Sequence, residues 1–183
     1  MQPMTLDQWL AHDGPGELVG GHLVEEKAAT RPRIAVADWF AARLRDWASP
    51  RGGAVFGPGH KLAISATMGR KPEVVVYMPP HTPGETSTNT APTPTLIVEV
   101  SSADLVERRR VYMTAMRDYA GLGVHWYWTI DPSERLFESW QLDAEGHYTL
   151  FLVATEGAMS STGPEGLTLD LDALWAALAS LEP

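Results

Sequence analysis

The sequence predicts an α/β (α+β) fold in which a central mixed β-sheet is flanked by helices. Two β-branched runs, at residues 73–78 and 95–101, are typical of buried strands. Apolar residues recur at helical spacing between residues 32 and 48, which indicates an amphipathic helix. An aromatic run at residues 125–130 predicts a further strand. Because no linker or repeat interrupts these patterns, we expect one domain over residues 1–183.

The N-terminal part of the chain predicts a helix, a hairpin and a longer helix before the first buried strand. Thr5 is placed to cap the first helix, and Gly20-Gly21 is a hairpin turn signal. The elements expected here are a helix over 6–11, strands at 17–19 and 22–25, a helix over 32–48 and a strand at 61–66.

The C-terminal part begins with the two buried strands, which a Pro/Thr-rich surface loop over residues 79–94 connects. Ser101 or Ser102 is expected to cap the next helix, with Asp104 in its first turn. The buried face of this helix is expected to carry Leu105, Tyr112, Met116 and Tyr119. The remaining elements are a strand at 125–130, a hairpin of strands 135–142 and 147–153, and a helix over 171–181.

One carboxylate is embedded in each of the two buried strands, Glu73 after Pro72 and Glu99 within Val98-Glu99-Val100. Burying a carboxylate is costly unless a metal, a cation or hydrogen bonds compensate it. Two such residues on separate strands predict a shared site, and P-E…E-x-V resembles the P-D…(D/E)-x-K signature of metal-dependent nucleases. The alternative for Glu73 is an edge carboxylate with no such role.

Composition restricts the class of function. The net charge is −9 and the pI is about 5.0, which argues against passive coating of nucleic acid. It does not exclude a nuclease, because a bound cation neutralises metal-binding carboxylates. The absence of cysteine excludes disulfides and cysteine-ligated zinc. With no signal-peptide pattern and no apolar run of about 20 residues, we expect a cytoplasmic protein with no membrane partner.

Four segments, in this order and spacing, resemble one family. They read ELVGGHLVE (17–25), KPEV (71–74), VEVSS (98–102) and YAGLGVHWYWTIDP (119–132). The corresponding family patterns are E-L-I-D-G-E-L-V-E, R-P-D-V, V-E-V-L-S and Y-x-x-x-G-V-x-E-Y-W-x-V-D-P. The chain therefore resembles the Uma-two family of restriction endonucleases, which has the PD-(D/E)XK nuclease fold. The resemblance covers nearly the whole chain and implies a restriction-endonuclease-like fold.

The resemblance implies three catalytic positions, two of which are filled. The family aspartate corresponds to Glu73 and the family glutamate to Glu99, whereas the family lysine, four residues before Tyr119, falls on Ala115. Such a lysine orients the nucleophile and stabilises developing charge, so its loss predicts weakened catalysis. Lys71 is the expected substitute, because residues two apart in an extended segment point to one side.

The expected cofactor is Mg²⁺, or Mn²⁺ in its place. Hydrolysis of a phosphodiester needs a metal to polarise phosphate oxygens and activate water. Mg²⁺ takes one or two carboxylates and keeps several waters, so Glu73 and Glu99 suffice, and the resemblance implies the Val100 carbonyl as a third ligand. A family histidine before the first long helix is also missing, and Arg31 and Arg33 are the nearest basic residues.

Other charged residues near these positions have two interpretations each. Arg108, Arg109 and Arg110 form a basic run on a helix, which either contacts substrate phosphates or is a solvated face. Glu17 and Glu25 flank the N-terminal hairpin and either line the same cleft or are solvated or capping residues.

The resulting functional hypothesis is a Mg²⁺-dependent endonuclease that hydrolyses DNA, with a degenerate site. The alternative is a catalytically inactive nuclease-fold protein with a binding or assembly role, favoured by the missing lysine and the acidic charge. A hydrolase of another class lacks support, since no G-x-S-x-G, phosphate loop or H-E-x-x-H is present. A homodimer is expected, because four tryptophans exceed what a small core needs: Trp126, Trp128, Trp140 and Trp175.

Overall fold

A six-stranded main sheet organises the part of the chain that the computed structural model describes, residues 2–25, 28–81, 92–160 and 162–181. Its strands are β4 (Ala54–Phe56), β7 (Val74–Tyr77), β8 (Leu96–Val100), β9 (Trp126–Asp131), β10 (Leu136–Leu142) and β11 (Tyr148–Ala154). They lie in the order β11-β10-β9-β8-β7-β4. β8 and β9 are parallel and the other neighbours are antiparallel, so the predicted mixed sheet is confirmed.

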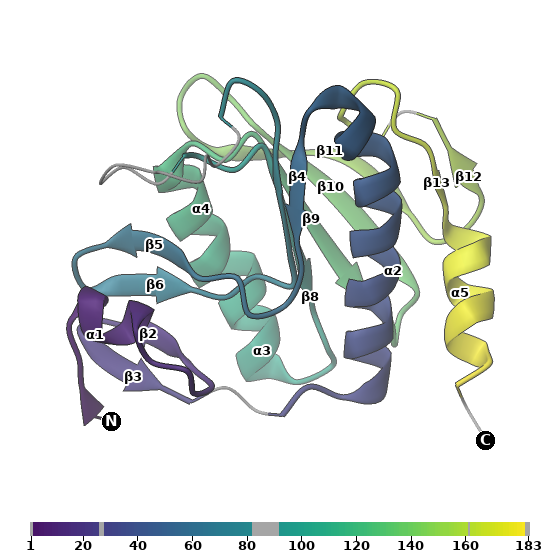
Figure 1. Cartoon of the computed structure of the whole chain (residues 1–183). Coiled ribbons are helices and arrows are strands. Elements are labelled where there is room, and N and C mark those ends of the chain that lie inside the picture. The colour runs from purple at the N-terminus through teal and green to yellow at the C-terminus, as the bar shows by residue number, and fades with distance from the viewer. Residues whose placement is uncertain (1, 26–27, 82–91, 161, 182–183) are drawn as a thin grey trace.

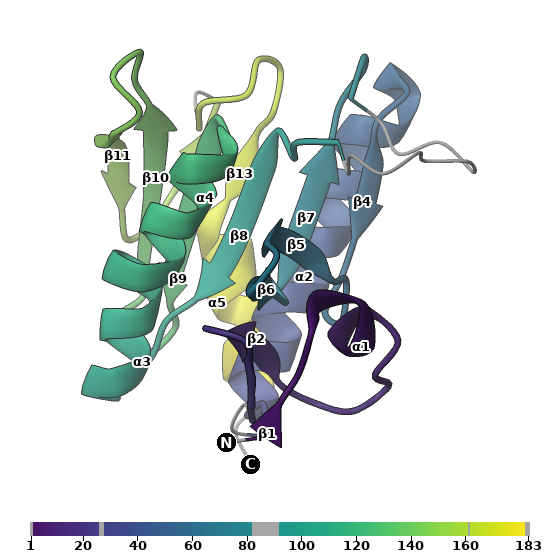
Figure 2. The same ribbon diagram turned by 90° about the vertical axis from the view of Figure 1, so that its left-hand side faces the viewer.

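A smaller five-stranded sheet lies to one side of the main sheet (Figures 1 and 2). In spatial order its strands are β1 (Gln2–Pro3), β3 (His22–Val24), β2 (Glu17–Val19), β6 (Met68–Arg70) and β5 (Leu62–Ser65). A two-stranded ribbon joins β12 (Ala158–Met159) to β13 (Leu169–Asp170). The predicted N-terminal hairpin is confirmed, whereas β1, β4, β6, β12 and β13 were not predicted, because strands of two or three residues show no periodic pattern.

Helices cover both faces of the main sheet (Figure 1). The helices are α1 (Leu6–Leu10), α2 (Arg31–Ala48), α3 (Leu105–Arg109), α4 (Met116–Leu122) and α5 (Leu171–Ala179), with a 3-10 turn η1 (Ser49–Arg51) and a π-helical segment η2 (Arg110–Ala115). One face is covered by α2 and α5, and the other by the continuous α3–η2–α4 helix that connects the parallel strands β8 and β9. The predicted Thr5 cap of α1 is confirmed by a reciprocal capping box with Gln8.

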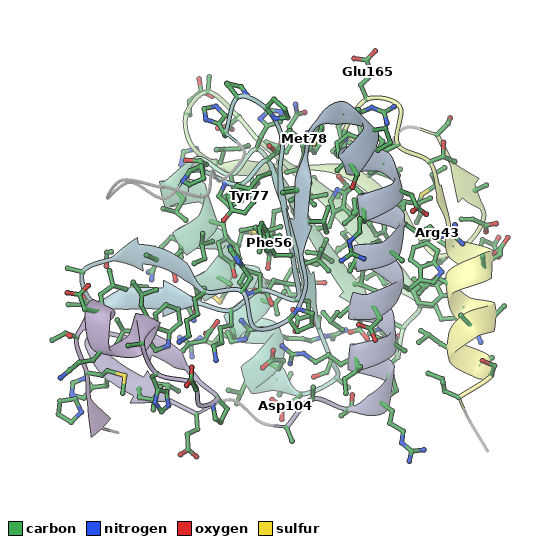
Figure 3. All side chains as sticks on the ribbon, in the orientation of Figure 1. Arg43, Phe56, Tyr77, Met78, Asp104 and Glu165 are labelled. Carbon is green, nitrogen blue, oxygen red and sulfur yellow. The ribbon has the colours of Figure 1, made fainter. Side chains whose placement is uncertain are left out.

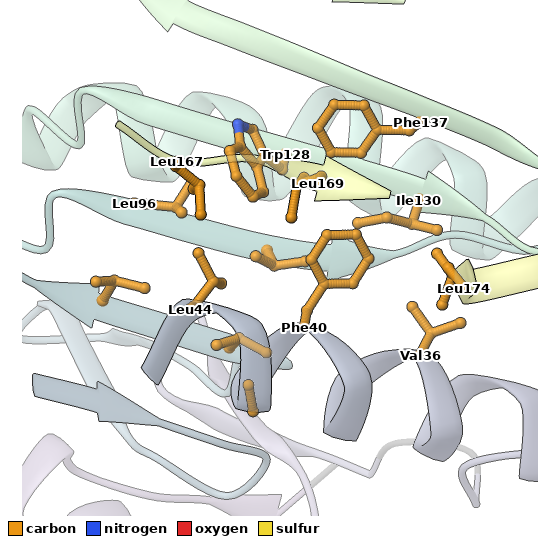
Figure 4. Packing of buried hydrophobic residues seen from close by; sticks show 14 of the residues in the cluster. Val36, Phe40, Leu44, Leu96, Trp128, Ile130, Phe137, Leu167, Leu169 and Leu174 are labelled. Carbon is orange, nitrogen blue, oxygen red and sulfur yellow. The ribbon is translucent and has the colours of Figure 1, made fainter. Parts of the chain in front are cut away.

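The larger core lies between the main sheet and α2 with α5. Phe40 of α2 stands at its centre, with ring centroids 6.1 Å from Trp128 and 6.2 Å from Phe137 (Figure 4). Even-numbered residues of the central strands, such as Val74 and Val98, supply the sheet side of this core. Strand side chains alternate between faces, so the odd-numbered residues must point to the opposite face.

That opposite face packs on the α3–η2–α4 helix. Val75, Ile97 and Tyr127 meet helix residues of a second apolar cluster there. Glu73 and Glu99 have the same parity as these residues and therefore project toward the same helix. The alternation thus places both carboxylates of the predicted site on one face of the sheet.

The start of this helix differs from the prediction in two respects. Asp104, not Ser101 or Ser102, is the N-cap, and its side chain accepts from the backbone N–H groups of the next turn. Leu105 is 80% exposed and does not belong to the buried face. The exposure of Leu105 follows from the π-helical segment η2. A π-turn inserts one extra residue, so the residues before it lie on a different face of the helix from the one that a regular α-helix would give them.

The tryptophans that suggested a dimer surface are mostly inside the fold. Trp126, Trp128 and Trp175 are buried, and Trp140 is partly buried. The interpretation that they exceed one core was wrong, because the two faces of the main sheet provide two clusters of buried residues. They therefore lend no support to a dimer.

No helix among the described residues is long and apolar enough to cross a membrane. Of the loop expected over residues 79–94, residues 82–91 lie outside the described part of the chain.

Candidate functional site

Glu73 and Glu99 stand opposite each other at the end of the β7–β8 ladder. Val74 pairs with Val98 in this antiparallel register, so the next pair along is Glu73 with Glu99. Residues directly opposite on one face have Cβ atoms about 5 Å apart, and like charges at that spacing are destabilising. Both side chains are buried, Glu99 completely. The fold therefore brings the two predicted carboxylates together and requires that their charge be compensated.

Hydrogen bonds engage all four carboxyl oxygens of the pair. Glu73 accepts from Arg33 at Oε1 and from the Val100 N–H at Oε2, the latter over 3.1 Å. Glu99 accepts from the Tyr119 hydroxyl at Oε1 over 2.6 Å and from Arg110 Nη2 at Oε2 over 2.9 Å.

The pKa values of the two carboxyl groups shift in opposite directions. Burial raises the pKa of Glu73 well above its usual range, and the nearby charge of Glu99 raises it further. Burial alone would also raise the pKa of Glu99, but the charge of Arg110 and the hydrogen bonds from Arg110 and Tyr119 lower it. Glu73 is therefore the member of the pair that takes up a proton more readily, and Glu99 is the member that stays charged more readily.

Two arginines supply the positive charge at this site. Arg33, from the first turn of α2, is ion-paired with Glu73, and Arg110, from η2, is ion-paired with Glu99. Both arginines also donate to Glu107 Oε1, over 3.2 Å from Arg33 Nη1 and 2.8 Å from Arg110 Nη2. Glu107 therefore closes a ring of charged groups around the carboxylate pair.

Glu17 of β2 connects this ring to the smaller sheet, as one interpretation of the sequence predicted. Its Oε1 lies 3.8 Å from Arg110 Nη1, and its Oε2 accepts from Arg70, which also donates to Asp118 of α4. Glu25, by contrast, is exposed and makes no hydrogen bond or ion pair with the residues that the structure describes.

The structure does not bring Lys71 to the carboxylate pair. Its Nζ donates to the Gly14 carbonyl over 2.9 Å, and its backbone N–H donates to Glu17. The ammonium group of Lys71 therefore does not approach Glu73 as expected, because it is hydrogen-bonded to the loop between α1 and β2. Arginines are therefore the cations on the pair.

The family lysine position, Ala115, is fully buried in the cluster under the main sheet. It lies one turn before Tyr119, whose hydroxyl reaches Glu99. A lysine there would have to enter a packed apolar region, which costs about 1–3 kcal/mol for overpacking alone. The cation position is instead filled from the preceding π-segment, by Arg110.

The basic run divides into three separate environments. Arg108 Nη2 donates to Asp131 Oδ2 at the end of β9 over 3.0 Å. Arg109 is exposed and makes no ion pair with the described residues. Only Arg110 reaches the carboxylates, so the structure brings one of the three predicted substrate-binding residues into the site.

The donor set suits a hard divalent cation. Among the described residues no group of three or more His, Asp or Glu side chains is arranged to hold a metal. Mg²⁺ needs only one or two carboxylates, because it keeps most of its waters. Pro72, the residue that faces Val100 in the register, has no N–H and cannot donate to the Val100 carbonyl. Glu73, Glu99 and this carbonyl therefore fit the metal, provided that the arginines release the carboxylates.

Sequence reasoning missed two members of the site. Glu107 lies three residues before Arg110 on the helix, and this spacing was the available signal. Tyr119 was assigned only to the buried face of the helix, although a buried hydroxyl needs a partner.

Comparisons with known proteins identify a family and a shared fold. The family described as "Uma2: Putative restriction endonuclease" matches residues 4–173. A crystal structure of "a putative nuclease belonging to DUF820" from Anabaena variabilis matches with a TM-score of 0.72 and 16% sequence identity, over 96% of this chain and 99% of that one. No curated protein sequence matches significantly. The structural similarity shows that the two chains share a fold.

Proposed function

Because this chain belongs to the Uma2 family, described as putative restriction endonucleases, we propose that it hydrolyses DNA phosphodiester bonds with a divalent metal ion at Glu73 and Glu99. The observation that carries the proposal is that Glu73 and Glu99 lie buried and opposite each other at the end of the β7–β8 ladder. Without a function, two opposed buried carboxylates would be a cost to the fold. The proposal treats residues 1–183 as one restriction-endonuclease-like domain acting in the cytoplasm.

The residues of the chain have distinct roles in this proposal. Glu73, Glu99 and the Val100 carbonyl hold the metal, with Mg²⁺ as the natural ion and Mn²⁺ as a substitute. When bound, the metal polarises a phosphate oxygen and lowers the pKa of the attacking water. Arg110 stabilises developing negative charge but cannot act as a general base, because it stays protonated. We therefore expect slow catalysis.

Glu107 can keep both arginines ion-paired when a metal displaces them from Glu73 and Glu99. It already accepts from Arg33 and Arg110 in the metal-free arrangement. If both guanidinium groups shift so that they pair only with Glu107, neither cation is left buried without a partner, and that cost in free energy is avoided. Arg108 and Arg109, from the same helix, are proposed to contact flanking DNA phosphates.

A second candidate function is a catalytically inactive nuclease-fold protein with a binding or assembly role. The observation that favours it is that guanidinium, hydroxyl and N–H donors engage every oxygen of Glu73 and Glu99. If the arginines never release these oxygens, no metal can enter.

A plasmid-nicking assay separates the two candidates. We expect slow Mg²⁺-dependent nicking by the wild type, none by Glu99→Gln, and no change in Lys71→Ala, since Lys71 is held on Gly14. Arg110→Lys replaces the permanent cation by one that can exchange a proton, so nicking should accelerate by about tenfold or more. Nicking by Glu99→Gln at the wild-type rate would overturn the nuclease proposal. No nicking by any of these proteins would favour the inactive candidate.

We also propose that two copies associate through β11. This edge strand pairs only with β10 among the described residues, and Leu150, Phe151 and Val153 are each nearly half exposed. Residues 148–154 contain no charged side chain, so two copies can pair antiparallel about a two-fold axis without like-charge repulsion. Such a homodimer would present two sites, one for each DNA strand.

A further inference from the structure

A cavity of about 750 Å³ opens beside the carboxylate pair. It lies where α2 and the β8–α3 connection begin and where α5 ends, and Arg33, Val100 and Glu107 of the site form part of its wall. Its volume falls within the range of about 300–1,000 Å³ that is typical of small-molecule sites. The cavity and the proposed catalytic site are therefore contiguous.

A buried hydroxyl without a partner lies in the wall of this cavity. Ser101 is 2% exposed, and its Oγ makes no hydrogen bond with the described residues, although its N–H donates to the Ile130 carbonyl. Buried polar groups in folded proteins nearly always have a partner, and one without a partner costs about 1–3 kcal/mol. The Ser101 hydroxyl therefore lacks a partner at the cavity wall, and because its oxygen is itself covered, a ligand reaches it only when the wall shifts locally.

Positive charge gathers on one wall. Arg31 lines the cavity, is exposed and forms no ion pair with the described part of the chain. The N-terminus of the 18-residue helix α2, capped by Thr30, lies beside it and favours anions. Of the two acidic residues in the wall, Asp104 caps α3 and Glu107 holds the arginine pair. Arg31 is therefore the cation in the wall that remains to meet an anionic ligand.

Another part of the wall is apolar. Leu178 and Leu181 of the C-terminal segment, with Pro132 and Ala103, contribute to it. These features match the parts of a nucleotide. Arg31 suits the phosphate, the Ser101 hydroxyl suits a polar group of the sugar, and the apolar wall suits the base.

We propose that this cavity binds one unpaired nucleotide of the DNA substrate, with its phosphate at Arg31 and its sugar or base against the apolar wall. This inference rests on the proposed nuclease function. Duplex DNA does not fit, because a cavity of about 750 Å³ has the size of a small-molecule site. The nucleotide must come from a single-stranded end or be extruded from the duplex, which makes single-stranded or locally opened DNA the preferred substrate.

The test is calorimetric titration of the protein with 5′-phosphorylated tetrathymidylate in EDTA, so that no metal contributes. Ser101→Ala removes the hydroxyl, and Arg31→Gln removes the cation. Arg43→Gln is the matched control, because Arg43 lies farther along the same helix, beside Trp39 and away from the Asp104 end of the molecule (Figure 3). Thermal melts verify folding, and Ser101→Ala should melt no lower than the wild type, since it deletes a hydroxyl without a partner.

We expect each site variant to weaken binding about tenfold, as for loss of a hydrogen bond to a charged group, and Arg43→Gln to bind as the wild type does. Equal weakening by Arg31→Gln and Arg43→Gln, absence of binding, or equally tight binding of a blunt duplex would overturn the inference. This titration contains no metal, so its result does not depend on catalysis. Failure of the nuclease proposal would show instead in the plasmid-nicking assay, as nicking that does not depend on metal.

Discussion

Arg110 and Glu99 form an ion pair with Nη2 and Oε2 2.9 Å apart, and Glu99 is completely buried. An arginine, not a lysine, is thus the cation on Glu99. Because the guanidinium stays protonated at every accessible pH, this pair can balance charge but cannot exchange a proton. The same contact makes Arg110 a competitor of any metal for Glu99.

Arg110→Gln should therefore destabilise the metal-free protein and make its stability depend on metal. Removing one partner of a buried ion pair typically costs about 3–5 kcal/mol, because the other charge is left uncompensated. A metal that binds only the native state should restore about 2.7 kcal/mol at a hundred times its Kd. Urea unfolding with EDTA and with excess Mn²⁺ measures both effects.

Arg109→Gln is the control for this experiment, since Arg109 is the neighbouring, exposed arginine and carries the same charge. Its free energy of unfolding should change by less than about 0.5 kcal/mol. If Arg110→Gln were as destabilised in Mn²⁺ as in EDTA, the arginine and the metal would not share Glu99.

The carboxylate pair could be predicted from the sequence because local patterns determine it. A strand period of two and an antiparallel register suffice to place Glu73 opposite Glu99. The arginine partners could not be predicted in this way. Arg33 and Glu107 are 74 residues apart and meet only because α2 and α3 begin at the same end of the sheet. The direction of Arg110 depends on the π-turn η2, which has no recognised sequence signal.

The edge strand β11 gives a prediction about assembly. Val153→Lys places a charge on the exposed edge, which is a common way in which proteins prevent strand pairing. In light scattering at micromolar concentration we expect the wild type at twice its 20.0 kDa mass and this variant at the monomer mass. Met113→Lys, at an exposed apolar residue of η2, should remain dimeric. A monomeric wild type would disprove the proposed dimer.

Asp131 gives a prediction about pH. Burial alone would raise the pKa of Asp131, but hydrogen bonds from Ser133 and Arg108 outweigh burial and lower it. A carboxyl with a lowered pKa stabilises the folded state above its unfolded pKa of about 3.9, and this stabilisation is lost as the pH falls through the folded-state pKa.

Asp131→Asn should therefore lower the free energy of unfolding at pH 7 by about 2 kcal/mol. The difference from the wild type should shrink as the pH falls below about 3.9. Urea unfolding at several pH values measures it, with the exposed Asp46→Asn as a control of equal charge change. A difference that does not vary with pH would show that the Asp131 charge contributes nothing.

Calorimetric titration of the wild type and of Glu99→Gln with Mn²⁺ tests the central claim most directly. The account predicts one Mn²⁺ bound per chain by the wild type and none by Glu99→Gln, since Glu99 is the carboxyl of the pair whose pKa is lowered. Absence of Mn²⁺ binding by the wild type, or equal binding by both proteins, would contradict the assignment of Glu73 and Glu99 as a metal site.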